Sequence, residues 1–185
     1  LELSKARPEH LIYIYDEENK LINQNKLDDH NAFIIKPISG LQNFSKGISF
    51  FSASVLLLHK NKPEAAVIYD PIKNELFIAE NGQGAFVNNS RMRMSGNRNI
   101  HNTVILLENE EIIYVKELKN FFEKHSKNIR ILRSTCLDLA NLASGRVDCY
   151  ICTNTALNYE PGFLMVRESG GVTINKKENE DISFI

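Results

Sequence analysis

The sequence FIIKPISGLQNFSKGISFF occupies residues 33–51. Its apolar beginning contains two adjacent β-branched isoleucines, and it predicts a buried strand over residues 32–35. Pro37 and Gly40 predict that this strand breaks into a turn, and a new strand is expected from Ile48. Because loops at the edge of a sheet often carry binding and catalytic side chains, the turn is the candidate functional site.

The composition is that of a globular protein with its own core. The 185 residues are 43% hydrophobic and 24% charged, with a formal net charge of −1. This charge provides no general attraction to nucleic acid or to an anionic membrane. No apolar run approaches about 18 residues, and the first residues lack a secretory signal pattern. We therefore expect a cytoplasmic protein with no membrane partner, and the sequence gives no direct signal for nucleic-acid binding.

The first half of the chain is expected to be a meander of short strands. The connections between these strands are short and contain Asn, Pro, Asp and Gly, which favours antiparallel pairing of neighbours. A further short strand is expected near the N-terminus, over residues 10–15. The predicted strands of the meander cover residues 50–59, 65–69, 75–79 and 85–87.

The second half mixes helices and strands. Apolar residues at helical spacing predict a helix over residues 114–127. Ser134 is a candidate N-cap for a helix that ends near Gly145, and Pro161 suits the first turn of another. Strands are expected over residues 104–107, 129–132, 147–152 and 172–174. The order of the predicted strands and helices indicates one α/β domain over residues 1–185, a layered α+β sandwich. Residues 32–103 are expected to form its antiparallel part and residues 104–185 its mixed part.

Three short motifs favour structural roles. Cys149 and Cys152 form a lone CxxC in a strand pattern, where residues three apart point to opposite faces, so we interpret them as buried thiols. The basic cluster Arg91–Met94, with Arg98 nearby, is interpreted as a solvated edge. The acidic run over residues 16–18 is interpreted as a surface loop that could hold a cation.

Three segments resemble the inositol monophosphatase family, which includes the bacterial extragenic suppressor protein. Residues 36–44 match the family pattern Asp-Pro-Ile-Asp-Gly-Thr-Xaa-Asn-Phe at Pro37, Ile38, Gly40, Asn43 and Phe44. Residues 82–88 match a strand and turn of the family, and residues 138–171 follow its C-terminal half.

The resemblance implies an αβαβα sandwich that lacks the N-terminal helix pair and the C-terminal strand and helix. Because the chain begins at Leu1 and stops at Ile185, we expect one or both ends to be missing. The resemblance also implies magnesium-dependent hydrolysis of inositol or sugar phosphate monoesters, by water activated between metal ions. A homodimer is expected because family members are usually dimers.

The positions that bind metal in the family are changed in this sequence. The two aspartates of the family motif correspond to Lys36 and Ser39 here, and the family's threonine corresponds to Leu41. The aspartate that closes the family's site corresponds to Asn158. Three negative charges are thus replaced by one positive charge. At an effective dielectric constant of about 20, a cation roughly 4 Å from Lys36 is repelled by about 4 kcal/mol per unit charge. We expect no metal cofactor and a catalytically inactive homologue.

An inactive site could still bind phosphate or retain a single metal ligand. Lys36, Gly40 and Arg133, which replaces a glycine of the family, could hold phosphate or a phosphorylated sugar without hydrolysing it. In the opposing interpretation, the Lys36 side chain simply extends to solvent. Asp16 or Glu17 could remain as a metal ligand.

Two further alternatives concern the whole protein. In the first, Asp16, Glu17, Asp148 and Glu160 act as displaced ligands of a working phosphatase. In the second, the protein is a non-catalytic interaction protein, since the extragenic suppressor branch is associated with RNA polymerase and ribosomal RNA transcription.

Overall fold

The computed structural model describes residues 2–16, 31–97, 99–114, 116–125, 128–153, 159–175 and 183–184. For residues 116, 117, 125, 175, 183 and 184 it describes only the backbone. Three residues singled out from the sequence, Glu17, Arg98 and Asn158, lie outside this described part.

The first half forms a sheet that, in the described residues, has seven strands in chain order. The first two strands pair in parallel, and every later neighbour pairs antiparallel, which confirms the predicted meander. Its strands are β1 (Leu11–Ile14), β2 (Ala32–Ser39), β3 (Ser52–His59), β4 (Lys62–Asp70), β5 (Glu75–Glu80), β6 (Gly84–Val87) and β7 (Ser90–Arg91).

The second sheet has the order β11-β12-β10-β8-β9. Its central strand β10 pairs in parallel with β8 and antiparallel with β12. The strands are β8 (Ile105–Leu107), β9 (Ile129–Arg130), β10 (Cys149–Cys152), β11 (Ile174–Asn175) and β12 (Ser183–Phe184). The helices are α1 (Glu2–Ala6), α2 (Leu41–Ser45), α3 (Lys116–His125), α4 (Thr135–Ala143) and α5 (Glu160–Glu168), with 3-10 turns η1 (Ile100–Asn102) and η2 (Glu110–Tyr114).

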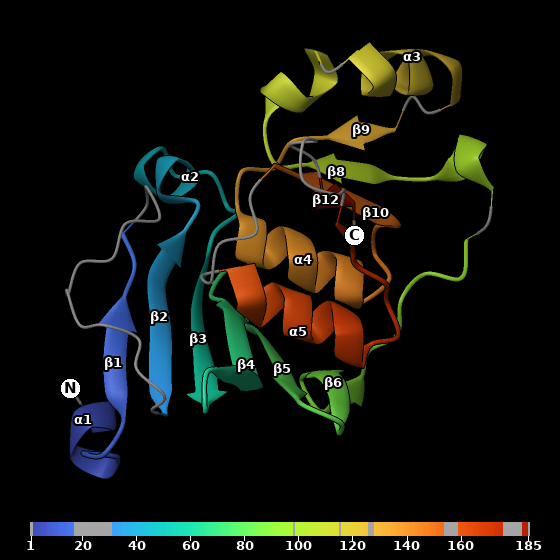
Figure 1. Cartoon of the computed structure of the whole chain (residues 1–185). Coiled ribbons are helices and arrows are strands. Elements are labelled where there is room, and N and C mark those ends of the chain that lie inside the picture. Colours follow the sequence, from blue (N-terminus) through green and yellow to red (C-terminus); the bar gives the residue numbers. More distant parts are fainter. Residues whose placement is uncertain are drawn as a thin grey trace.

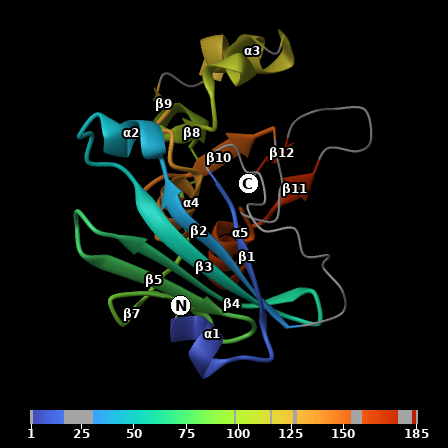
Figure 2. The same cartoon turned by 90° about the vertical axis from the view of Figure 1, so that its left-hand side faces the viewer.

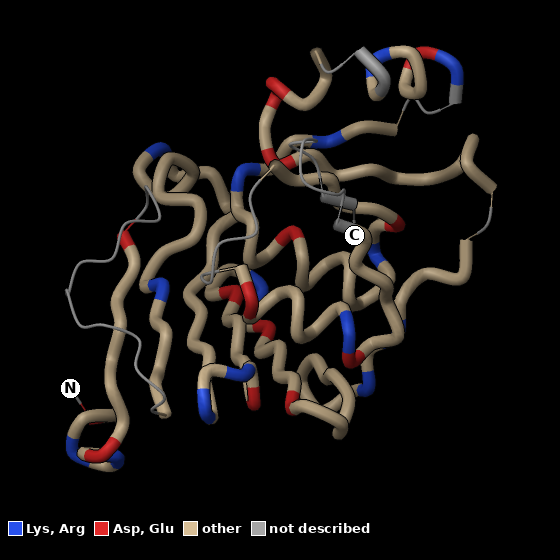
Figure 3. The backbone as a smooth tube through the Cα atoms, viewed as in Figure 1, with Lys and Arg blue, Asp and Glu red and all other residues tan. Residues whose placement is uncertain are grey.

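The elements stack in layers. Helices α4 and α5 lie between the two sheets, and α3 covers the far side of the second sheet (Figure 1). One hydrophobic cluster joins the inner face of the first sheet to α4 and α5, and a second joins β8 and β10 to η2 and α3. Charged residues gather at strand ends and turns and are sparse within the strands of the first sheet (Figure 3). No helix among the described residues has the length and apolar character needed to cross a bilayer.

The outer face of the first sheet is also apolar. Buried and partly exposed residues alternate along its strands, so every second side chain points away from α4 and α5. Tyr69, Leu76 and Ile78 on this face are 37%, 40% and 38% exposed. Figure 2 shows this outer face, with α1 at one edge of the sheet. No side chain of α1 is buried. The face is formed by Ile12, Ile14, Phe33, Ile35, Val55, Leu57, Ala65, Val67, Tyr69, Leu76 and Ile78.

Several boundaries differ from the sequence-based prediction, and the strand expected from Ile48 begins only at Ser52, after the helix α2. Strand β2 does not break at Pro37 but continues to Ser39, because the pairing register with β3 shifts between Lys36 and Ser39. A proline without an N–H group is tolerated at such an irregularity. The helix predicted from Tyr114 begins at Lys116, since η2 precedes it, and the last predicted strand lies at Ile174–Asn175.

The two central helices touch at a glycine. Gly162 in α5 lies against Leu139 in α4, and an added Cβ at Gly162 would approach the Leu139 Cβ to 2.4 Å and its Cδ1 to 2.5 Å. Leu139 is fully buried. The absence of a side chain at Gly162 therefore sets how closely α4 and α5 pack.

Candidate functional site

The turn after β2 is closely packed. Gly40 has φ +91°, in the left-handed region that favours glycine. A Cβ at Gly40 would lie 3.1 Å from the carbonyl oxygens of Phe50 and Arg133 and from the Cβ of Ser134. The turn that the sequence predicted as the site thus packs against the segment that leads into α4.

Asn43 fixes this packing from within α2. Its side-chain amide donates to the carbonyl oxygens of Phe50 and Leu132, both at 2.8 Å. One amide therefore ties α2 to two segments, one of which lies 89 residues further along the chain. The matched asparagine of the motif has a structural role here.

Ser39 sits at the N-terminus of α4. The Ser134 hydroxyl donates to the Ser39 carbonyl oxygen at 2.9 Å, and the Cys136 backbone N–H donates to the Ser39 Oγ at 3.3 Å. Ser39 is 1% exposed. Ser134 occupies the predicted N-cap position, but its side chain makes no capping bond to the helix. The hydroxyl of Ser39 satisfies one of the first helical N–H groups instead.

Lys36 does not extend to solvent. It lies on the inward-facing side of β2, is 6% exposed, and its Nζ is 5.9 Å from the centroid of the Tyr159 ring. This is the distance range of a cation–π contact. The interpretation of Lys36 as a solvated lysine is therefore wrong, and the ammonium group remains inside the protein near Tyr159.

Tyr159 is held in place by a carboxylate. Its hydroxyl donates to Glu108 Oε1 at 2.6 Å. The other oxygen of Glu108 accepts from the backbone N–H of Thr153 at 2.8 Å and from the Thr153 hydroxyl at 3.0 Å. A connected series therefore runs from Lys36 through Tyr159 to Glu108. Neither Glu108 nor Tyr159 was predicted as a site residue, although Glu108 directly follows the buried strand β8.

The other predicted phosphate ligands are only partly gathered. Gly40 and Lys36 both lie at the end of β2, and the Arg133 backbone packs against Gly40. The Arg133 guanidinium instead forms an ion pair with Glu110, where its side chain is 45% exposed. Leu41, at the start of α2, is 36% exposed.

The acidic candidates for metal binding do not come together. Asp16 follows β1, whose end lies beside β2. The Asp148 carboxylate accepts from the Ser95 hydroxyl at 2.5 Å and from the Val104 N–H at 2.8 Å, before the start of β10. Glu160 pairs with Arg167 at 3.2 Å, beyond the opposite end of β10. The described residues contain no group of three or more His, Cys, Asp or Glu side chains placed to hold a metal ion.

Asp138 is a buried carboxyl group in the first turn of α4. Burial raises the pKa of Asp138 well above its ordinary value, and a hydrogen bond with the Ser134 backbone only partly opposes this rise. A raised pKa keeps a carboxyl group neutral over a wider pH range. Burial thus disfavours the charged form of Asp138.

The two CxxC cysteines face different cores. Cys152 belongs to the cluster between the first sheet and the helices, whereas Cys149 packs against the cluster beneath α3. Burial is the main cause that raises the pKa of the Cys149 thiol to about 11. The prediction that the two thiols point to opposite faces is confirmed, and Cys152 is buried as predicted, whereas Cys149 is only partly buried.

The comparisons with known proteins agree on one family. The model of the inositol monophosphatase family matches residues 2–183. An inositol-1-monophosphatase of Mesorhizobium japonicum is 34% identical over 188 residues, with 98% of this chain and 69% of the relative covered. A Nus factor SuhB of Buchnera aphidicola is 35% identical over 185 residues, with coverage of 96% and 66%. The chain belongs to the inositol monophosphatase family.

Solved structures confirm the predicted fold. The extragenic suppressor protein suhB from Bartonella henselae superposes with a TM-score of 0.82 at 37% identity, over 99% of this chain and 73% of that one. The Thermotoga maritima IMPase gives a TM-score of 0.81 at 30% identity, with coverage of 99% and 72%. The chain spans 64% to 69% of the length of the curated relatives it matches.

Proposed function

We propose that this chain is a member of the inositol monophosphatase family that does not hydrolyse phosphate monoesters. The observation that supports the proposal is the burial of Lys36, which is 6% exposed, at the position of a motif aspartate. The neighbouring motif position, Ser39, presents a neutral hydroxyl that is already bonded to the N-terminus of α4.

The residues at these positions do not suit magnesium. Magnesium is a hard cation that is bound by carboxylates and substrate phosphates. Lys36 offers three donors and no acceptor, and the nearby Glu108 already accepts three hydrogen bonds from Tyr159 and Thr153. We therefore assign no step of a metal-assisted hydrolysis to this site.

The same lysine supports a second function, the binding of phosphate without turnover. An ammonium group inside a protein can form charge-assisted hydrogen bonds with a phosphate oxygen. Lys36 is kept inside the protein next to Tyr159, four residues before Gly40 in the chain. A phosphorylated sugar or inositol phosphate is the substrate class of the family and thus the proposed ligand.

Calorimetry tests both proposals. Titration with manganese is expected to give no binding heat, and titration with inositol 1-phosphate is expected to give binding that weakens at least about tenfold in Lys36→Met. Methionine keeps the length of the side chain and removes its charge. Lys46→Met is the matched control, because Lys46 follows the nearby helix α2 and is exposed.

The two titrations have distinct outcomes. A manganese site would contradict the loss of metal binding. Equal phosphate affinity in the wild type and in Lys36→Met, or no heat with inositol 1-phosphate at all, would exclude the proposed phosphate site.

A role in transcription is an alternative function that involves no catalysis. Relatives at 33% to 35% identity are named Nus factor SuhB, and an inactive site would not prevent an interaction role of that type. Tagged protein is then expected to retain RNA polymerase subunits from a lysate of its own source. Retention of none, at a load that recovers a Nus factor SuhB complex in parallel, would argue against this alternative.

A further inference from the structure

The segment that leaves the first sheet after β7 has two chemically different sides. Met92 is 3% exposed and its N–H donates to the Ala85 carbonyl oxygen at 2.8 Å. Met94 packs against the main core, and its N–H donates to the Ser169 carbonyl oxygen at 3.2 Å. Arg91 and Arg93 alternate with these methionines and are exposed. The basic cluster found in the sequence is thus anchored by its methionines along the C-terminal end of α5.

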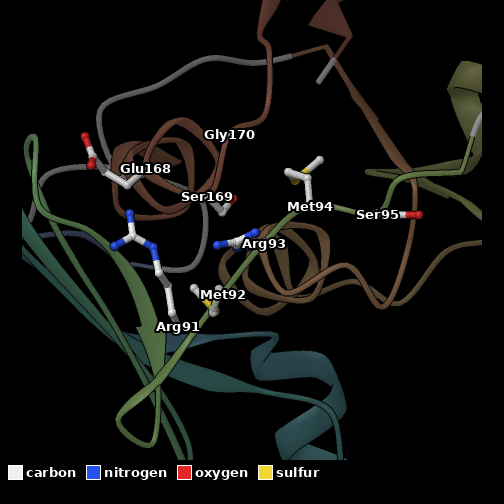
Figure 4. A pocket seen from close by; sticks show the side chains of 8 residues that line it. All are labelled: Arg91, Met92, Arg93, Met94, Ser95, Glu168, Ser169 and Gly170. Carbon is white, nitrogen blue, oxygen red and sulfur yellow. The ribbon is translucent and has the colours of Figure 1, made fainter.

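A cavity of about 510 Å³ lies between this segment and α5. Figure 4 shows the guanidinium groups of Arg91 and Arg93 on the side of the segment that faces the end of α5, near Ser169. The volume is within the range of pockets that hold small molecules. The lining residues are Arg91, Met92, Arg93, Met94, Ser95, Glu168, Ser169 and Gly170.

The charge in this cavity is not balanced. Glu168 is the only carboxylate among its lining residues, and its two oxygens accept from the backbone N–H groups of Gly82 at 2.9 Å and Gly84 at 2.8 Å. Neither Arg91 nor Arg93 forms an ion pair with a carboxylate in the part of the chain that the structure describes. Arg91 instead lies 5.8 Å from the centroid of the Phe86 ring. Both guanidinium groups therefore keep N–H donors for a ligand.

We propose that this cavity binds a small anion with two oxyanion groups. A guanidinium presents a planar set of donors that matches a phosphate or a carboxylate. Arg91 and Arg93 each bind one oxyanion group of the same ligand. The site lies on α5 and β7, away from the turn at Gly40, and is independent of the function proposed above.

Two probes show whether the cavity binds phosphoryl groups or carboxylates. Pyrophosphate supplies two phosphoryl groups, and citrate supplies carboxylates. Calorimetric titration of the wild-type protein is expected to give binding with at least one of them, weaker at high salt because the contact is ionic. Arg91→Gln and Arg93→Gln are each expected to weaken that binding about tenfold, and the double variant to abolish it.

A control variant locates the binding. Arg130→Gln changes an exposed arginine of the second sheet, whose Nη1 donates to the neighbouring Ile129 carbonyl oxygen at 2.8 Å, and is expected to retain wild-type affinity. Equal unfolding temperatures exclude misfolding as the cause of a loss. Binding of neither probe by the wild type, unchanged affinity in both cavity variants, or an equal loss in Arg130→Gln would overturn the proposal.

Discussion

Hydrolysis of inositol 1-phosphate by this protein is expected to stay at the rate of the buffer alone, with magnesium or manganese in excess. Enzymes typically accelerate their reactions by about 10⁶-fold or more, so even a weakly active phosphatase would exceed this background clearly. The expected loss follows from the proposed inactivity, which rests on the buried ammonium of Lys36. Release of inorganic phosphate over several hours measures the rate.

The assay needs a positive control and a variant that can identify true activity. The inositol-1-monophosphatase of Mesorhizobium japonicum, at 34% identity, serves as the control. Metal-dependent turnover that disappears in Asp16→Asn would show that displaced ligands operate, and the inactive interpretation would then be wrong. Turnover that survives in that variant and needs no metal would point to a contaminant, which a second purification would remove.

Gly162→Ala is expected to destabilise the protein strongly. The new methyl group would meet the Leu139 Cβ at 2.4 Å, and this atom cannot move without a shift of α4 itself. Overpacking of this kind costs about 1–3 kcal/mol or more, against a gain of up to about 1 kcal/mol in helix propensity. A net loss of about 2 kcal/mol lowers the midpoint of thermal unfolding by roughly 4–8 °C in a chain of this size. Calorimetry or circular dichroism measures the shift.

Two further variants separate this contact from a general effect of replacing glycine. Gly96→Ala is the matched control, because an added Cβ there has no neighbour within 4 Å, and its midpoint should remain within about 1 °C of the wild type. In the background of Leu139→Ala, the cost of Gly162→Ala should fall only in part, since alanine removes the Cδ1 contact at 2.5 Å but keeps the Cβ contact at 2.4 Å. An unfolding midpoint of Gly162→Ala equal to that of Gly96→Ala would contradict the close packing of α4 and α5.

Local patterns in the sequence predicted most of the strands and the turn that organises the site. Alternation and turn residues located the antiparallel meander, and Gly40 marked the turn with a left-handed backbone. These features depend on residues close together in the chain. The end of β2 was missed because the tolerance for Pro37 arises from its pairing with β3.

The partners of the candidate site could not be predicted in the same way. Lys36 and Tyr159 meet across two layers of the fold, and Glu108 joins them from the second sheet. Ser134 appeared to be an ordinary N-cap, yet its hydroxyl bonds to Ser39, 95 residues earlier. Arg133 was assigned to phosphate, but Glu110 pairs with its guanidinium. Each of these contacts depends on tertiary structure that no local pattern encodes.

The order of the layers has a consequence for how the protein is made. The strands β2 to β6 are complete at Val87, but the helices that cover their inner face end only at Glu168. At roughly 5–20 residues per second, a ribosome needs on the order of ten seconds to synthesise the intervening chain. During that interval the apolar inner side of the nascent sheet lacks its native cover, and this is the period in which a molecular chaperone would have most to protect.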